Sequence, residues 1–90
     1  MRAMKRPLPV EVWRIEDLSS DNTLAIPAWV LKAVLAHTLE AGADGKGLFI
    51  TTLEGEMYGK VGDWLIQGAV GELYSVDAKV FDQTYDILPS

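Results

Sequence analysis

Asp63 and Glu72 are the two carboxylates whose placement offers the most chemistry in this chain. A carboxylate pair can hydrolyse a glycosidic bond when one group is an acid with a raised pKa and the other is a nucleophile or base. Both must then lie in one cleft, and the surrounding residues indicate no cleft. Asp commonly accepts backbone hydrogen bonds in turns, and Asp63 follows a glycine. We therefore expect Asp63 in a turn and Glu72 on a solvent-facing strand, and keep a carboxylate-based hydrolase as a less favoured alternative.

His37 is the only histidine, and the chain has no cysteine. A zinc site needs several His, Cys or carboxylate ligands, and no second His or Cys exists to join His37. As a general base, His37 would need a nucleophile such as Ser75, Thr51 or Thr84, and no spacing favours one of them. We predict no catalytic residues, no metal site and no cofactor, and hence a protein that is not an enzyme.

Glycines at 68 and 71 enclose Ala69 and Val70. A phosphate-binding loop would need a following Lys-Ser/Thr pair and a long helix, and both are missing. The segment instead predicts the turn of a β-hairpin.

The chain carries three tryptophans and three tyrosines, which is more than a minimal core of this size requires. Exposed Trp and Tyr side chains commonly anchor protein interfaces. Core packing is the more common role for each one, so the sequence leaves open whether Trp64 faces the core or a partner.

One helix is expected from Pro27 to Ala41, with Gly42 past its end, and it would position Trp29 and His37. Proline suits the first position of a helix and glycine the position after its last turn. An apolar stripe at helical spacing is expected to face the core. Its members are Leu31, Val34, Leu35, Thr38 and Leu39.

Short strands are expected before and after this helix, because β-prone runs alternate with glycine turns. They cover 10–15, 48–53, 57–61, 64–67 and 72–76. Asp77 is expected to cap a short helix over 78–84. Tyr85–Leu88 is expected to form a last strand. The fold class is therefore α+β, a small bent antiparallel sheet or partial barrel covered by one main helix, with a short C-terminal helix.

Ninety residues indicate a single domain over 1–90, with residues 1–6 as a flexible tail. A polar connector is expected from Glu16 to Thr23. Residues 1–14 hold four basic groups and one acid, whereas the rest holds four lysines and twelve acids. An acidic body repels phosphate backbones, which argues against nucleic acid as the main partner. No segment is apolar enough to predict a membrane span, and the absence of cysteine favours a cytoplasmic location.

The C-terminal half resembles a family of small proteins encoded by tailed phages and prophages. The matching residues are Thr52-Leu53-Glu54-Gly55, then Gly62-Asp63-Trp64-Leu65-Ile66, Gly68, Gly71-Glu72, Tyr74, Phe81 and Thr84-Tyr85. The family pattern in this half reads TLEG, PGDWII, G, GE-YP and F--TYE. The N-terminal Lys5-Arg6-Pro7 and Val10-Glu11-Val12-Trp13 are similar to the family's opening strand.

Three positions depart from that pattern, because Val61, Ser75 and Ala78 stand where the family has proline. Each departure removes a turn-fixing residue and no chemical group. The resemblance implies a phage or prophage gene acting in the cytoplasm of a bacterial host cell. It carries over no catalytic residues.

The leading hypothesis is a non-enzymatic phage or prophage accessory protein that binds a host or phage protein, for example as an anti-defence factor. Acidic, aromatic-rich surfaces can occupy basic clefts on other proteins. The expected interaction surface consists of Glu54, Glu56, Tyr58, Asp63, Trp64 and Glu72. The alternative is a small-ligand binder that holds a nucleotide signal by stacking on Trp64 or Tyr74, with the amides of 68–71. A homodimer is a further possibility for this chain, because small folds often cover apolar surface by self-association.

Overall fold

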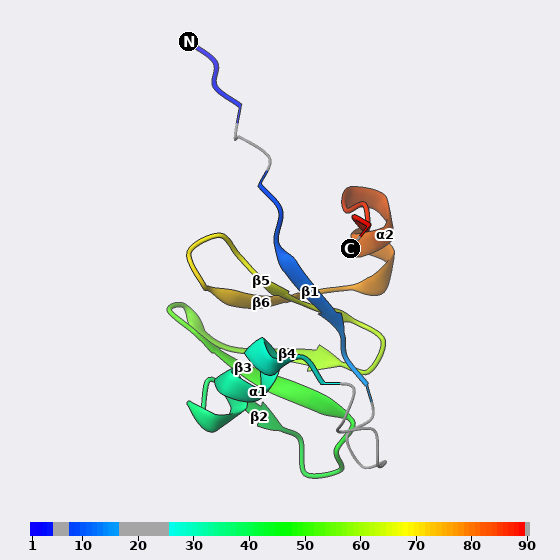
Figure 1. The fold of residues 1–90 in the computed structure, drawn as a ribbon. Coiled ribbons are helices and arrows are strands. Elements are labelled where there is room, and N and C mark those ends of the chain that lie inside the picture. The colour runs from blue at the N-terminus through cyan, green and yellow to red at the C-terminus, as the bar shows by residue number, and fades with distance from the viewer. Residues whose placement is uncertain (5–7, 17–25, 90) are drawn as a thin grey trace.

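The computed structural model describes residues 1–4, 8–16 and 26–89, and it places two helices with two antiparallel sheets (Figure 1). The elements in chain order are β1 (Glu11–Arg14), α1 (Ala28–Leu35), β2 (Leu39–Ala41), β3 (Gly47–Thr52), β4 (Gly55–Lys60), β5 (Trp64–Gln67), β6 (Leu73–Val76) and α2 (Ala78–Thr84). The predicted α+β class is confirmed.

The strands form two three-stranded sheets, ordered β1-β5-β6 and β2-β3-β4. The sequence predicts one bent sheet, and the difference arises at the turn between β4 and β5. There Asp63 N–H donates to Lys60 O at 3.0 Å, and Gly62 adopts a φ of 95° that favours glycine. This turn carries the chain from one sheet to the other. The partial barrel stays a prediction.

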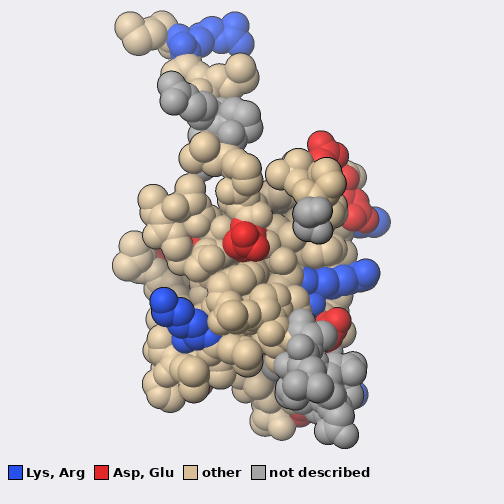
Figure 2. All heavy atoms as spheres, viewed as in Figure 1, with Lys and Arg blue, Asp and Glu red and all other residues tan. Residues whose placement is uncertain are grey.

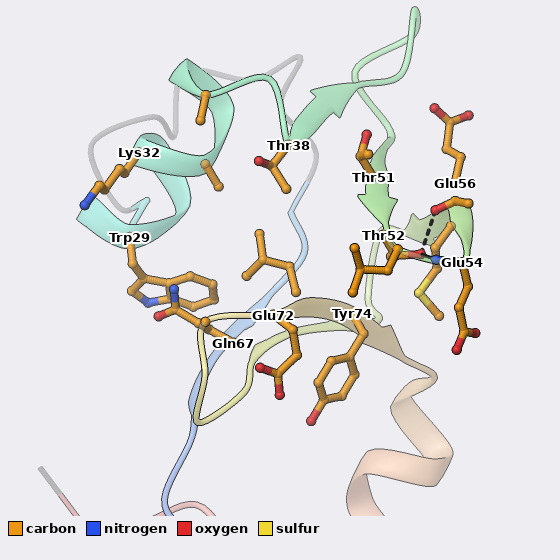
Figure 3. A pocket seen from close by; sticks show the side chains of 17 residues that line it. Trp29, Lys32, Thr38, Thr51, Thr52, Glu54, Glu56, Gln67, Glu72 and Tyr74 are labelled. Carbon is orange, nitrogen blue, oxygen red and sulfur yellow. Dashed lines mark hydrogen bonds between the residues drawn. The ribbon is translucent and has the colours of Figure 1, made fainter.

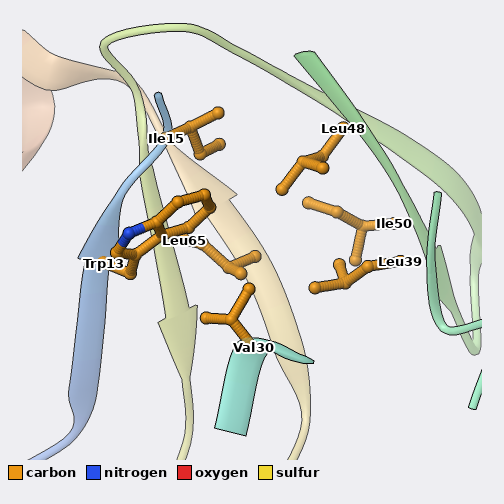
Figure 4. Close-up of a cluster of buried hydrophobic side chains, with 7 residues drawn as sticks. All are labelled: Trp13, Ile15, Val30, Leu39, Leu48, Ile50 and Leu65. Atoms are coloured by element: carbon orange, nitrogen blue, oxygen red, sulfur yellow. The ribbon is translucent and has the colours of Figure 1, made fainter. Parts of the chain in front are cut away.

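The core lies between the inner faces of the two sheets, with one residue of α1 closing it (Figure 4). Strand alternation turns Trp13 inward from β1 and Leu48 and Ile50 inward from β3. The fully or nearly fully buried members are Trp13, Ile15, Val30, Leu39, Leu48, Ile50 and Leu65. Each buried aliphatic side chain stabilises the fold by about 1.5–3 kcal/mol relative to an exposed one.

The predicted helix over 27–41 is wrong in its second half, because α1 ends at Leu35. His37 follows with a φ of +61°, in the left-handed region, and its N–H donates to Val34 O at 3.0 Å. Leu39 then pairs with Ile50 in β2–β3 and is 1% exposed. The predicted apolar stripe is also wrong for α1, since Leu31 and Leu35 are exposed and Val30 is the buried residue.

The C-terminal helix agrees with its prediction, because Asp77 Oδ1 accepts a hydrogen bond from Lys79 N–H at 2.9 Å at the start of α2. Phe81, on α2, stacks on Trp64 of β5 with ring centroids 4.1 Å apart. It also stacks on Tyr85 at 4.9 Å. The strand expected over Tyr85–Leu88 is wrong, because residues 85–89 form neither helix nor strand.

Residues 1–4 are exposed, and the N-terminus stands away from the two sheets (Figure 1). The rest of the expected tail, residues 5 and 6, lies outside the described residues, as does the expected connector from residue 17 onward. Neither of the described helices has the length and apolar character that a membrane crossing requires.

Candidate binding groove

A groove of about 890 Å³ lies where α1, the β3–β4 hairpin and the β5–β6 turn meet (Figure 3). These three walls are far apart in sequence, and contacts of β3 with β6 and of α1 with β2 bring them together. The volume lies within the range of about 300–1,000 Å³ that is typical of ligand pockets.

The first wall is the side of α1 that carries Trp29 and Ala33, continued by the C-cap residue Ala36, with Lys32 at its edge. These residues are three or four positions apart, so they share one side of the helix. Trp29 and Ala33 are half-buried and also pack against the core next to Val30. The helix therefore presents an apolar wall whose position is fixed by the core.

The second wall is the tip of the β3–β4 hairpin. Thr52 Oγ1 donates to Gly55 O at 2.6 Å and accepts from Glu54 N–H at 3.3 Å. Gly55 has a φ of 123°, which a residue with a side chain rarely adopts. This tight turn leaves Leu53 fully exposed at the tip, beside Glu54.

The third wall is the turn between β5 and β6, which confirms the hairpin predicted over 68–71. Gly68 N–H donates to Glu72 O at 2.8 Å, and Gly71 N–H donates to Gly68 O at 3.0 Å. Val70 N–H donates to Glu72 Oε2 at 3.2 Å. A side chain at position 68 would overlap the Glu72 carboxylate in its present position over this turn. These three amides are thus occupied within the turn.

Tyr74 lies at the end of the groove next to Glu72. Burial, the hydroxyl of Tyr85 at 3.5 Å and the negative charge of Glu72 together raise the pKa of Tyr74 to about 12. Tyr74 is therefore a neutral hydrogen-bonding group at physiological pH and has no tendency to act as a base.

Three of the six predicted surface residues, Glu54, Glu56 and Glu72, line this groove. Tyr58 is exposed elsewhere on β4, where its ring lies 5.0 Å from that of Phe49.

Asp63 and Trp64 are packed into the fold. Asp63 is 9% exposed, and its Oδ2 accepts from Lys60 N–H at 3.2 Å, as expected for a turn residue. Trp64 is half-buried, and one face of its ring stacks on Phe81.

Asp63 and Glu72 lie at opposite ends of β5. Glu72 bonds to Gly68, and the five residue-to-residue steps from Asp63 to Gly68 span about 16 Å of extended chain. The two carboxyls of a glycosidase lie roughly 5–9.5 Å apart. These two residues therefore do not form the carboxylate site of the hydrolase alternative.

The groove offers hydroxyls of Thr38, Thr51 and Thr52, three carboxylates and one amine, Lys32. His37 is exposed and is absent from its lining, so no histidine stands beside these hydroxyls. Within 1–4, 8–16 and 26–89, no group of three or more His, Cys, Asp or Glu residues could hold a metal ion. The arrangement suits the binding of another molecule through apolar contact and complementary charge.

Several lining residues were missed by the sequence reasoning. They are Trp29, Lys32, Leu53, Met57, Gln67 and Leu73. One signal was available, because Trp29 lies off the expected apolar stripe of the helix. The others could not be found, since only the pairing of the strands brings the two hairpins beside α1. Searches of protein-family models, of curated proteins and of solved structures find no match to this chain.

Proposed function

We propose that this domain is a non-enzymatic binding protein that takes a segment of a partner protein into the groove between α1 and the two hairpins. The observation that carries the proposal is the composition of the groove. Apolar side chains line all three walls, and three acidic residues are among the lining.

Apolar contact supplies the affinity in this proposal. Leu53 is fully exposed at the hairpin tip, and Met57 behind it is 37% exposed. Trp29 provides an aromatic wall on α1. Binding hot spots are enriched in such aromatic side chains, and burial of an exposed leucine contributes about 1.5–3 kcal/mol.

Charge supplies the selectivity. Glu54, Glu56 and Glu72 line the groove, against Lys32 as the one cationic residue among the described lining. Residues 15–90 as a whole hold four lysines and twelve acids. Complementary charge steers association, so the favoured partner segment is basic with an apolar anchor.

The biological setting follows from the resemblance of the C-terminal half to the tailed-phage and prophage family. In this proposal the protein acts in the cytoplasm of a bacterial host as a phage accessory factor, and the partner is a host or phage protein.

Small-ligand binding is the second candidate, because the volume of the groove and the placement of Tyr74 and Trp29 would suit a compact aromatic ligand. A nucleotide fits less well. Its phosphates would meet three carboxylates, and the amides of Gly68, Val70 and Gly71 are bonded inside the turn. A thermal-shift screen with nucleotides would reveal such a ligand as a rise in Tm.

Affinity capture from bacterial lysate tests the protein-binding proposal when it uses three matched baits. The first is the unchanged protein, the second carries Leu53→Asp in the groove, and the third carries Leu35→Asp on α1. Leu35 is 82% exposed and does not line the groove, so both substitutions leave the core intact. We expect a partner retained by the first and third baits and lost from the second. Recovery of the same proteins by all three baits, or of none by the unchanged bait, contradicts the proposal.

A further inference from the structure

We infer that the outer edge of β1 is a second interaction surface, at which two copies of this chain pair edge to edge. This surface is distinct from the groove described above, although Tyr74 lines both the groove and the hollow beside β1, and the inference does not depend on the proposed partner. It comes from the backbone of β1 and from the apolar residues beside it.

The hydrogen bonds of β1 identify which backbone groups face outward. Ile15 N–H donates to Asp63 O at 2.8 Å, so Ile15 bonds toward the chain that enters β5. Along an antiparallel strand the direction of the backbone groups alternates, which points Trp13 and Glu11 toward β5 as well. The N–H and C=O groups of Val12 and Arg14 therefore point away from the sheet.

No described strand pairs with this outer edge, because β1 ends the order β1-β5-β6. The opposite end of that sheet is covered, since β6 contacts both β3 and β4. An uncovered edge offers a row of unpaired donors and acceptors to another strand.

A second hollow of about 830 Å³ runs beside this edge. Residues 8–12 form one side and residues 85–89 form the other, with Tyr74 and Phe81 also in contact with it. Leu8, Ile87 and Leu88 are 58%, 64% and 63% exposed. An added strand would thus gain main-chain bonds from β1, with the exposed apolar side chains of the hollow close to the edge.

A second copy is the occupant that this edge fits. A two-fold axis beside Val12 places Val12 opposite Val12 of the second copy, and the outward groups of Arg14 opposite those of Val10. In this register Glu11 stands opposite Trp13, so no like charges face each other across the pair.

The surface charge is compatible with such a pair. Two copies of a chain with a net charge of −5 repel each other, so contact requires a face with few charged side chains. The face over β1 and α1 carries only scattered charges of both signs (Figure 2).

Sedimentation equilibrium of the purified chain tests this inference, with Val12→Pro as the disrupting variant. Proline removes the outward N–H of Val12 and leaves the bonds of β1 to β5 in place. Ala69→Pro is the matched control, because Ala69 is exposed in the β5–β6 turn, at a position that suits proline. We expect the unchanged chain and Ala69→Pro to reach twice the monomer mass of 9.9 kDa, and Val12→Pro to dissociate at least tenfold more readily.

A monomer at every concentration up to about 1 mM, the range of the weakest specific association, overturns the inference. A folded Val12→Pro that dimerises as well as the control also overturns it. If Val12→Pro fails to fold, amide hydrogen exchange on the unchanged chain decides. Protection of Val12 and Arg14 that rises with protein concentration supports edge pairing, and protection that does not change rules it out.

Discussion

Gly59 on β4 faces Ile15 and Ser75 across the space between the two sheets. A Cβ placed on Gly59 would stand 2.6 Å from Cδ1 of Ile15 and 3.2 Å from Cβ of Ser75. Ile15 is 1% exposed and Ser75 belongs to β6, so neither neighbour can move freely. Gly59 is not among the glycines with positive φ, so the space between the sheets, and not the backbone, requires glycine here.

Gly59→Ala therefore tests how tightly the sheets are packed. Overpacking of a core costs about 1–3 kcal/mol. The smaller conformational freedom of alanine in the unfolded chain offsets about 0.4–1 kcal/mol of that cost. We expect a net loss of about 1–2 kcal/mol in the free energy of unfolding, measured by urea denaturation. A domain of this size loses about 4–8 °C in Tm for each kcal/mol.

The second change in this test is Ile15→Val, which removes the Cδ1 methyl that the new Cβ would meet. Alone it costs about 0.5–1.5 kcal/mol, as is usual for this substitution. The double variant should then lose less than the sum of the two single losses, by about 1 kcal/mol. Gly42→Ala is the control, because its nearest neighbours would lie 3.4 Å and 3.6 Å away. Strict additivity, or an equal loss in Gly42→Ala, would refute the proposed packing.

Three further outcomes are expected. Because the folded pKa of Tyr74 is about 12, above its ordinary 10.0, its contribution to stability is complete below pH 10 and is lost as the pH rises toward 12. Tyr85→Phe should lower this pKa in a tyrosinate absorbance titration, but not to its ordinary value, since burial persists; an unchanged pKa would exclude the hydroxyl contact. Asp77→Ala should cost about 1 kcal/mol by removing the cap of α2, whereas Asp77→Asn should cost much less in the same denaturation assay. His37→Gly should preserve or raise the Tm, because His37 occupies a left-handed conformation, and a clear drop would contradict this reading.

The strands from Gly47 to Val76 could be predicted because their signals are local. Glycine turns separate short β-prone runs there, and each run pairs with the next along the chain in β3–β4 and β5–β6. The signal for the helix cap at Asp77 is equally local, because the cap contacts an amide only two residues away. Such features need no knowledge of the tertiary structure.

The helix boundary at Leu35 could not be predicted in this way. Leu39, Glu40 and Ala41 have good helical propensity, yet they pair with β3 as a strand. The pairing of Leu39 with Ile50 buries both side chains, and this tertiary gain exceeds the small propensity difference. The groove depends on the same tertiary contacts, which is why the sequence identified its acidic residues but not its apolar walls.

We propose that the groove between α1 and the two hairpins binds a protein partner. Site-specific photo-crosslinking tests it most directly, with a photoreactive residue in place of Leu53 or, as the control, of Leu35. Both positions are largely exposed, but only Leu53 of the two lines the groove. In bacterial lysate we predict a discrete crosslinked protein from position 53, lost in Glu54→Lys/Glu56→Lys, and none from position 35. Crosslinking from position 35 alone, or from neither position, would contradict the claim.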